Sequence, residues 1–299
     1  MALFTRLIKR RIKSITNTRK ITKAMELVAA SKMRKAQLAT LATRPYSTRA
    51  WFLISDLASK TDQDLHPLLK HKFDVRKICL ILITSDRGLC GGFNAQIIKK
   101  SLEFILKEQK KGKEIELVTV GKKGRDFMAR HKMKIVADFV NLSSVTRLVE
   151  IKALTKMVLE DFINNKYDEI YLAYTDFVST IIQKPRIKKL LPFSVEKDAE
   201  LGEVGLVSKE EIKFYEFLFE PSPDIVLEYL LPRLVEVQIY QALLESNASE
   251  HSARMVAMKN ASDAASEMIF DLTLSYNQAR QAAITREIAE ISGGKAALE

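Results

Sequence analysis

The chain has 299 residues, 47% of them hydrophobic, and a formal net charge of +11. That many apolar side chains can build a buried core, so the composition excludes a wholly disordered protein. Two cysteines, Cys79 and Cys90, exclude a disulfide framework, and they show no Cys/His spacing typical of zinc. The apolar runs are of strand length, well short of the ~18 residues of a membrane-spanning helix.

The N-terminal segment, residues 1–44, is predicted to be a basic helix with a narrow apolar stripe. It contains twelve Lys or Arg residues and one acid, Glu26, and this excess of eleven equals the net charge of the chain. Such a charge predicts an acidic partner, which could be phosphates, anionic lipid or an acidic protein surface. A 4-3 spacing places small and apolar residues on one face, suited to pairing with another helix: Ile8, Ile12, Ile15, Thr22, Ala29, Met33 and Ala36.

The central part alternates between predicted strands and helices. The apolar run at 77–84 predicts a strand that is buried on both faces. Further strands are predicted at 114–120, 134–138, 169–177, 180–193 and 213–220, and helices at 94–107, 122–130 and 145–164. The alternation predicts a mainly parallel sheet with right-handed crossovers, and Pro185 places the 180–193 strand at its edge.

Two glycine-containing turns follow predicted strands. The loop TSDRGLCGGFN, 84–94, has neither the GxxxxGK[ST] nor the GxGxxG spacing of a nucleotide-binding loop. It is typical of a tight strand-to-helix turn, or of a loop exposed for protein contact through Arg87. The turn GKKG, 121–124, is interpreted in the same way, with solvated lysines.

No motif predicts bond chemistry by this chain. The four histidines (His66, His71, His131 and His251) are dispersed, and no GxSxG or HExxH motif is present. We therefore expect no catalytic residue, no metal and no cofactor.

The C-terminal segment is predicted to be a long helix, because neither Gly nor Pro occurs between Arg233 and Ser292. About 60 helical residues would span roughly 90 Å. Pro221 and Pro223 suit its start, and Gly293–Gly294 suit its end. A 4-3 repeat over several heptads predicts a coiled coil, antiparallel with the N-terminal helix. Its members are Leu234, Val237, Gln241, Leu244, Ala248, His251, Met255, Met258, Ser262, Ala265, Ile269, Leu272, Tyr276, Ala279 and Ala283.

The end of this helix, residues 279–294, combines small alanines with polar residues that lie close together. It is either an ordinary solvated helix end or a slim tip that sits in a narrow collar. The polar residues are Arg280, Gln281, Thr285, Arg286 and Glu287.

Long motifs spread over the chain carry a resemblance to a known family. They are NTRKITKAMELVAASKMRKA (17–36), TSDRGLCGGFN (84–94), LFEPSPDIVLEYLLPR (218–233), ALLESNASEHSARMVAMKNASDAASEMI (242–269) and LSYNQARQAAITREIAEI (274–291). The chain resembles the gamma subunits of F-type ATP synthases. The resemblance implies an α/β fold in which N- and C-terminal helices (1–60 and 221–299) form an antiparallel coiled coil. It also implies a Rossmann-like central domain (75–220) that binds no nucleotide.

The resemblance implies the central stalk of a rotary motor, which couples proton-driven rotation of a ring of c subunits to ATP synthesis or hydrolysis. The coiled coil would stand inside three alpha and three beta subunits, and the central domain would sit with epsilon on the c ring. Family positions that face alpha and beta, or couple rotation to catalysis, match Met25, Arg87, Cys90, Arg254, Arg280, Gln281, Thr285 and Glu287.

Further expectations concern the remaining contacts. Phe217 and Glu220 match the region that faces the c ring and epsilon. We also expect the basic side chains of Lys32, Arg34 and Lys35 to meet acidic loops of the catalytic subunits. Cysteines occur only at 79 and 90, so the regulatory cysteine insert of chloroplast forms is missing.

The family pattern already begins near Ile8, so the N-terminus is interpreted as helix rather than as a transit peptide. This favours a bacterial protein at the cytoplasmic face of the cell inner membrane. The alternative is a basic coiled-coil nucleic-acid-binding protein with an α/β head, although aromatic residues are not interleaved with the N-terminal charges. A Rossmann-type enzyme is a third class.

Overall fold

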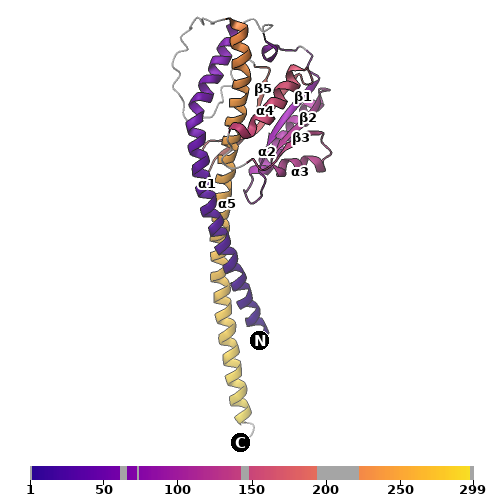
Figure 1. The fold of residues 1–299 in the computed structure, drawn as a ribbon. Coiled ribbons are helices and arrows are strands. Elements are labelled where there is room, and N and C mark those ends of the chain that lie inside the picture. Colours follow the sequence, from indigo (N-terminus) through magenta and orange to yellow (C-terminus); the bar gives the residue numbers. More distant parts are fainter. Residues whose placement is uncertain (1, 61–65, 73, 143–147, 194–221, 297–299) are drawn as a thin grey trace. The chain divides into compact units, whose positions relative to one another are not determined.

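The computed structural model describes residues 2–60, 66–72, 74–142, 148–193 and 222–296 (Figure 1). Its elements are α1 (Ala2–Lys60), η2 (Pro67–Leu69), β1 (Lys77–Ile83), α2 (Phe93–Gln109), β2 (Glu114–Val120), α3 (Lys122–Arg130), β3 (Ile135–Phe139), α4 (Leu148–Ile163), β4 (Glu169–Phe177), β5 (Gln183–Leu191) and α5 (Pro223–Ala296). Long terminal helices and a central α/β arrangement are present, so the predicted fold class is confirmed. The strand predicted at 213–220 lies outside the described residues.

The chain divides into two compact units. Unit 1 consists of residues 1–29 and 255–299, and unit 2 of residues 30–254. Each unit therefore contains one segment of α1 and one segment of α5. The sheet and helices α2 to α4 belong to unit 2.

The five strands of unit 2 form one sheet with the order β3-β2-β1-β4-β5. The first four are parallel to their neighbours, and β5 runs antiparallel to β4 at the edge. This edge position accommodates Pro185, because one side of an edge strand has no ladder partner. The strand begins at Gln183 rather than at residue 180, since a turn in which the Ser179 N–H donates to the Ile182 carbonyl (3.0 Å) precedes it.

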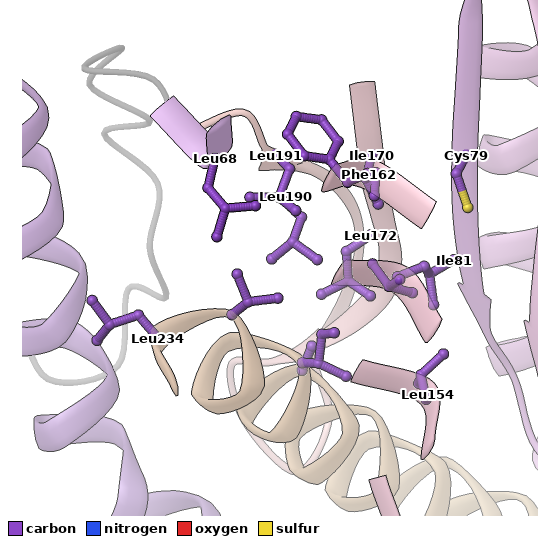
Figure 2. Packing of buried hydrophobic residues seen from close by; sticks show 14 of the residues in the cluster. Leu68, Cys79, Ile81, Leu154, Phe162, Ile170, Leu172, Leu190, Leu191 and Leu234 are labelled. Carbon is purple, nitrogen blue, oxygen red and sulfur yellow. The ribbon is translucent and has the colours of Figure 1, made fainter. Parts of the chain in front are cut away.

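The two faces of the sheet are covered by different helices, and β1 contributes to both cores. Successive residues of a strand point to opposite faces, which is why an unbroken apolar run fits this central position. Ile78, Leu80 and Leu82 pack with α2 and α3, while Cys79, Ile81 and Ile83 pack with α4 and α5. Figure 2 shows the second cluster, in which Ile81 lies near Leu172 of β4 and Leu154 of α4. The start of α5 enters this cluster through Leu234, so the helix is anchored in the core.

Within unit 2, α1 and α5 pack antiparallel through small side chains. The Thr43 hydroxyl donates to Gln241 Oε1 at 2.7 Å, and Gln238 Nε2 donates to the Ser47 carbonyl at 3.3 Å. Residue numbers rise along α1 as they fall along α5, which defines the direction of pairing. Small residues are buried on both helices here, with Ala36, Thr40 and Ser47 on α1 and Ala248 on α5.

Within unit 1, the two helical segments also pack antiparallel. Arg11 and Ile15 of α1 line one groove together with Met268 and Leu272 of α5. The predicted 4-3 repeat is confirmed in both units, because every seat from Leu234 to Ala283 is buried or half-buried. Its polar seats Gln241, His251 and Ser262 are buried as well.

The terminal helices are longer than their proline and glycine residues suggested. The excess of positive charge lies within residues 1–44, and the resemblance implied a helix over 1–60; α1 continues through Pro45 to Lys60. A proline removes one helical hydrogen bond, and Pro45 is exposed, so water can satisfy the freed carbonyl. Similarly, α5 begins at Pro223 as expected but passes Gly293–Gly294 and ends at Ala296. No helix in the described part of the chain is long and apolar enough to cross a bilayer.

Close packing at the ends of β1 and β2 requires two glycines. Gly121 has φ +94°, and a Cβ atom there would lie 2.1 Å from the Thr84 carbonyl oxygen. A Cβ atom on Gly124 would lie 2.8 Å from Thr84 Oγ1. That hydroxyl accepts the Gly124 N–H at 2.9 Å and donates to the Val120 carbonyl at 3.1 Å, which fixes the turn.

Replacing Gly121 with Ala should therefore destabilise unit 2 strongly. The new methyl group meets backbone atoms of Thr84, directly after β1, which cannot move without disturbing the sheet, and the positive φ adds strain. Gly112→Ala is the matched control, because φ is +82° there but no atom lies within 4 Å of the added Cβ. Thermal unfolding of the full chain should show a much larger loss of Tm for Gly121→Ala. Equal losses would contradict the steric explanation.

Candidate functional site

The carboxyl-terminal edge of the sheet is where doubly wound α/β folds bind ligands, at the point where the strand order reverses. In unit 2 this point lies between β1 and β4. α5 covers it at the end of β4: the Thr175 N–H donates to Ser246 Oγ at 3.1 Å, and Ser249 Oγ donates to the Thr175 carbonyl at 3.2 Å. A helix of the same chain therefore lies along the edge at which a ligand binds in related architectures.

Helix N-termini can also bind phosphate, and the N-terminus of α3 follows β2 at the same edge of the sheet. Here its first amides are satisfied within the protein. The Lys122 N–H donates to Asp86 Oδ1 and the Lys123 N–H to the Ser85 carbonyl, both at 3.1 Å. Since Gly124 is bonded to Thr84, the turn 121–124 serves to hold the loop after β1 against α3.

The loop 84–94 is ordered by bonds between its own two ends. Asn94 Oδ1 accepts the Ser85 N–H at 3.0 Å, and Asn94 Nδ2 lies 3.2 Å from Cys90 Sγ. Cys90 is thereby turned inward and is only 2% exposed, and burial raises the pKa of its thiol. Leu89, by contrast, is 62% exposed, and Arg87 is exposed too. The loop presents Arg87 and Leu89 to the outside, whereas the Cys90 side chain packs within it.

Arg254 of α5 ties this loop to the helix. Its Nη2 donates to the carbonyls of Arg87 and Gly88 at 3.1 and 3.2 Å, and its Nε donates to the Gly88 carbonyl at 3.3 Å. Its Nη1 forms an ion pair with Glu250 at 2.6 Å, one helical turn earlier. The fork of guanidinium donors is suited to such a multiple contact. The structure thus brings together two predicted site residues, Arg87 and Arg254, that are far apart in sequence.

Burial sets the ionisation states around Arg254. It raises the pKa of Glu250, against the opposing charge and hydrogen bond of Arg254. Burial, together with the charges of Arg254 and Lys32, lowers the pKa of His251 to about 4. His251 is therefore uncharged at neutral pH, and its Nδ1 accepts a hydrogen bond from Arg254 Nη1 at 3.2 Å. The expectation that His251 is a packed polar residue of the coiled coil is confirmed by its 5% exposure.

The basic face predicted for the N-terminal helix is exposed on α1. Glu26, its single acid, pairs with Lys23 at 3.0 Å. No other acid occurs within residues 1–44, so this segment carries a large excess of positive charge. The exposed basic residues are Arg6, Lys9, Arg10, Arg11, Lys13, Lys20, Lys23, Lys32, Arg34 and Lys35.

The other predicted contact residues are dispersed. Met25 is half-buried in unit 1. Four lie exposed on the unit 1 segment of α5, namely Arg280, Gln281, Thr285 and Glu287. Phe217 and Glu220 lie outside the described residues.

A buried cluster of charges in unit 2 was not predicted from the sequence. Arg44 of α1 lies 3.1 Å from Glu245 of α5 and 3.7 Å from Asp176 of β4. Arg186 of β5 lies 3.0 Å from the same Asp176. One signal was available, since an acid within the apolar strand EIYLAYTDF is rarely buried without a charged partner. The partners themselves could not be named, because they come from three distant segments.

The ionisation of Glu245 depends on its neighbours in this cluster. Burial and the negative charge of Asp176 raise its pKa to about 7, although Arg44 and the Gln241 side chain act in the opposite direction. The carboxylate is thus held in a place that disfavours its charge. Tyr174 lies beside it, and burial also raises the pKa of that phenol.

A substitution of Glu245 by Gln should change how stability depends on pH. Between pH 4.5 and about 7, the folded wild type retains a proton that the unfolded chain has lost. Its free energy of unfolding therefore falls as pH rises through this window and levels off above it. The variant has no such proton, so its decline should be smaller in urea unfolding series of the full chain at pH 5, 6, 7 and 8. Identical slopes in the two proteins would contradict the raised pKa.

Replacing Arg254 with Met should loosen the loop 84–94. The substitution removes the bonds to Arg87 and Gly88 and leaves Glu250 buried without its partner, at a cost of about 1–3 kcal/mol per lost charged contact. Hydrogen exchange of the full chain should become faster in peptides that cover this loop. Lys259→Met, an exposed cation on the same helix, is the control. Unchanged exchange in the Arg254 variant would show that the loop is ordered without it.

Comparisons with known proteins give one consistent answer. The family model described as ATP synthase matches residues 5–298. The chain is 46% identical to the ATP synthase gamma chain of Roseiflexus castenholzii over 295 residues, with 98% of each chain covered. It is 47% identical to that of Pelotomaculum thermopropionicum over 292 residues, again with 98% of each covered.

Solved structures agree with these sequence relatives. A chain from the central stalk and c ring of the Tetrahymena thermophila mitochondrial ATP synthase matches with a TM-score of 0.59 at 25% identity, covering 81% of this chain and 99% of that one. A chain from the Euglena gracilis mitochondrial enzyme shares the fold, with a TM-score of 0.68 at 18% identity and coverage of 100% and 95%. The motifs, the fold and these comparisons together place the chain in the ATP synthase gamma-chain family.

Proposed function

We propose that this chain is the central rotary stalk of a proton-translocating ATP synthase. It couples rotation of a c-subunit ring to ATP synthesis or hydrolysis at three alpha–beta pairs. Near full-length identity to bacterial gamma chains supports this role. The structural observation that carries it is a slender pair of helices, packed through small residues such as Ala36 and Ala248, with a basic outer face on α1.

Coupling rests on asymmetry. A single chain inside a ring of three equivalent pairs presents a different side to each pair. Each catalytic site is then biased among its conformations by differential contact with the stalk, and rotation moves that bias from site to site. The proposed domains have separate roles, since helices 1–60 and 221–299 form the shaft and the central domain 75–220 forms the foot.

The chain performs no bond chemistry in this proposal. Support comes from the two ligand positions of its fold, both of which are taken up by the chain itself. α5 is bonded to Thr175 at the edge of β4, and the first turn of α3 is bonded to Thr84, Ser85 and Asp86. Catalysis is assigned to the alpha and beta subunits, which the stalk only reorganises.

The contact residues receive distinct roles. Arg87 and Leu89 face a beta subunit from a loop that Arg254 holds against the shaft. Met25 and the four exposed tip residues, among them Gln281 and Glu287, contact the inside of the ring. Cys90 supports the loop from within rather than touching a partner, because its side chain is buried.

The location follows from the partners. Without a spanning helix in its described part, the chain reaches the membrane indirectly, through the c ring and epsilon. Phe217 and Glu220 are proposed for that contact. The relatives named above are bacterial gamma chains, and the proposal places this chain at the cytoplasmic face of the cell inner membrane.

The basic face of α1 also keeps one alternative open, a nucleic-acid-binding coiled coil. Purification at low salt separates the two functions. A nucleic-acid-binding protein co-purifies with DNA or RNA that salt releases, whereas a stalk co-purifies with alpha and beta subunits.

Charge reversal on this face tests the proposal. Replacing Lys32, Arg34 and Lys35 with Glu converts attraction to acidic loops into repulsion, so assembly with alpha and beta, or coupled ATP synthesis, should fall severalfold. Since surface charge contributes little to stability, the variant chain should still fold. The control reverses Lys152 and Lys156 on the exposed face of α4. Wild-type synthesis by the first variant in membrane vesicles would count against the proposed contact.

A further inference from the structure

Four charged side chains from α1, α5 and two strands, all buried or half-buried, meet at one point of unit 2. They are Arg44, Asp176, Arg186 and Glu245. The Arg44 guanidinium donates a hydrogen bond to Glu245 at 3.1 Å and lies 3.7 Å from Asp176, whose other oxygen is 3.0 Å from Arg186. Two positive and two negative charges compensate one another. We call this group the buried charge cluster.

From this arrangement we propose that the buried charge cluster locks the orientation of the α1/α5 pair on the sheet. Its members are positioning residues that carry torque between the foot and the shaft. The inference rests on the proposed rotary function, which supplies the torque. The cluster itself stands apart from the surfaces proposed to contact other subunits, because its two acids are buried and its two arginines are half-buried. Their exposed fractions are 1% for Asp176, 8% for Glu245, 13% for Arg44 and 14% for Arg186.

Stability alone does not explain the cluster. Charges lose solvation on burial, and apolar replacements of buried ion pairs are often neutral or stabilising. Glu245 illustrates the cost, since its environment raises its pKa to about 7. A helix packed on a sheet for stability alone would have apolar residues at these positions, as Leu234 and Leu243 have in the same helix.

A role in fixing the orientation of the two helices does explain the buried charge cluster. The nearby apolar contact consists of Ala36, Phe177 and Ala248. Apolar contacts are not directional, so this contact fixes the orientation of the helices only weakly. Ion pairs and hydrogen bonds are directional, by contrast, and lose most of their strength when partners separate or turn. With side chains about 5–6 Å from a helix axis, a rotation of about 30° moves a charged group by about 3 Å. Such a turn of either helix would break the contacts of Arg44 or Glu245.

The contacts of the cluster join α1, α5 and the sheet, which have to move together. Arg44 belongs to α1 and also donates to the Phe177 carbonyl of β4 at 3.4 Å. Glu245 belongs to α5 and accepts from Gln241, which is bonded to Thr43 of α1. The cluster therefore links the two helices to each other and to the sheet.

The test replaces all four charges by neutral groups of similar shape, as Arg44→Met, Asp176→Asn, Arg186→Met and Glu245→Gln. The variant chain is assembled into the whole complex and reconstituted in vesicles. ATP hydrolysis should continue, since no catalytic residue is touched, but proton pumping per ATP hydrolysed should fall severalfold. The control neutralises the exposed pair Lys156–Glu160 on α4 and should leave this ratio unchanged.

A distance measurement tests the lock itself. Spin labels at Leu38→Cys of α1 and Lys99→Cys of α2 report how the helix pair is held on the sheet, since both positions are exposed in unit 2. The native cysteines are buried and their pKa values are raised, which protects them from labelling. The distance distribution in the assembled complex should be narrow in wild type and broad in the neutral variant. If the neutral variant does not assemble, Arg44→Met and Arg44→Lys replace it, and the charge-retaining Lys should restore both the ratio and the narrow distribution.

The proposed lock would be overturned if the neutral variant, or Arg44→Met, kept both the wild-type ratio of protons pumped per ATP and a narrow distance distribution. A wild-type complex that does not couple hydrolysis to pumping would instead overturn the rotary function. The two failures are therefore distinguishable.

Discussion

The close approach of α1 and α5 is the constraint on which the rest of the structure depends. Several buried residues of the two helices are small, among them Ala36, Ser47 and Ala248, and small side chains let helices approach closely. Small side chains bury little apolar area, so the contact is supplemented by hydrogen bonds such as Thr43 to Gln241. The same choice leaves the outer face of α1 free to carry positive charge. The small size of the contact residues thus accounts both for the thin, charged helix pair and for the small apolar area that it buries.

In the central fold, a helix of the same chain occupies the sheet edge at which related folds bind ligands. Ser246 and Ser249 bond α5 to the end of β4 at the place where related folds bind nucleotides. The loop after β1 keeps its position in the fold but is bonded to Arg254 instead of a phosphate. As a result, a partner that pushes on the exposed Arg87 also pushes on α5. Two residues 167 positions apart are linked in this way, through the bond of Arg254 to the Arg87 carbonyl.

Much of the fold could be predicted from local patterns. The alternation of β1 with helices, the edge strand containing Pro185 and the heptad seats from Leu234 to Ala283 follow from periodicity and side-chain type. Single breaker residues are a weaker guide, since the exposed Pro45 lies inside α1. The Arg254 clamp and the buried charge cluster needed coordinates, because their partners meet only when distant segments fold together. The turned-in Cys90 shows the same limit: a resemblance placed it in an exposed loop, but only the bonds of Asn94 and Ser85 fix the side chain inward.

Rotation of the chain within its assembly is the central claim, and it can be observed directly. A bead attached at Lys99→Cys, an exposed position of α2, would report motion of this chain in a complex whose alpha and beta subunits are fixed to a surface. On addition of ATP the bead should turn in one direction, with pauses that divide each revolution into three. A chain that assembles with alpha and beta but stays still while ATP is hydrolysed would contradict the account.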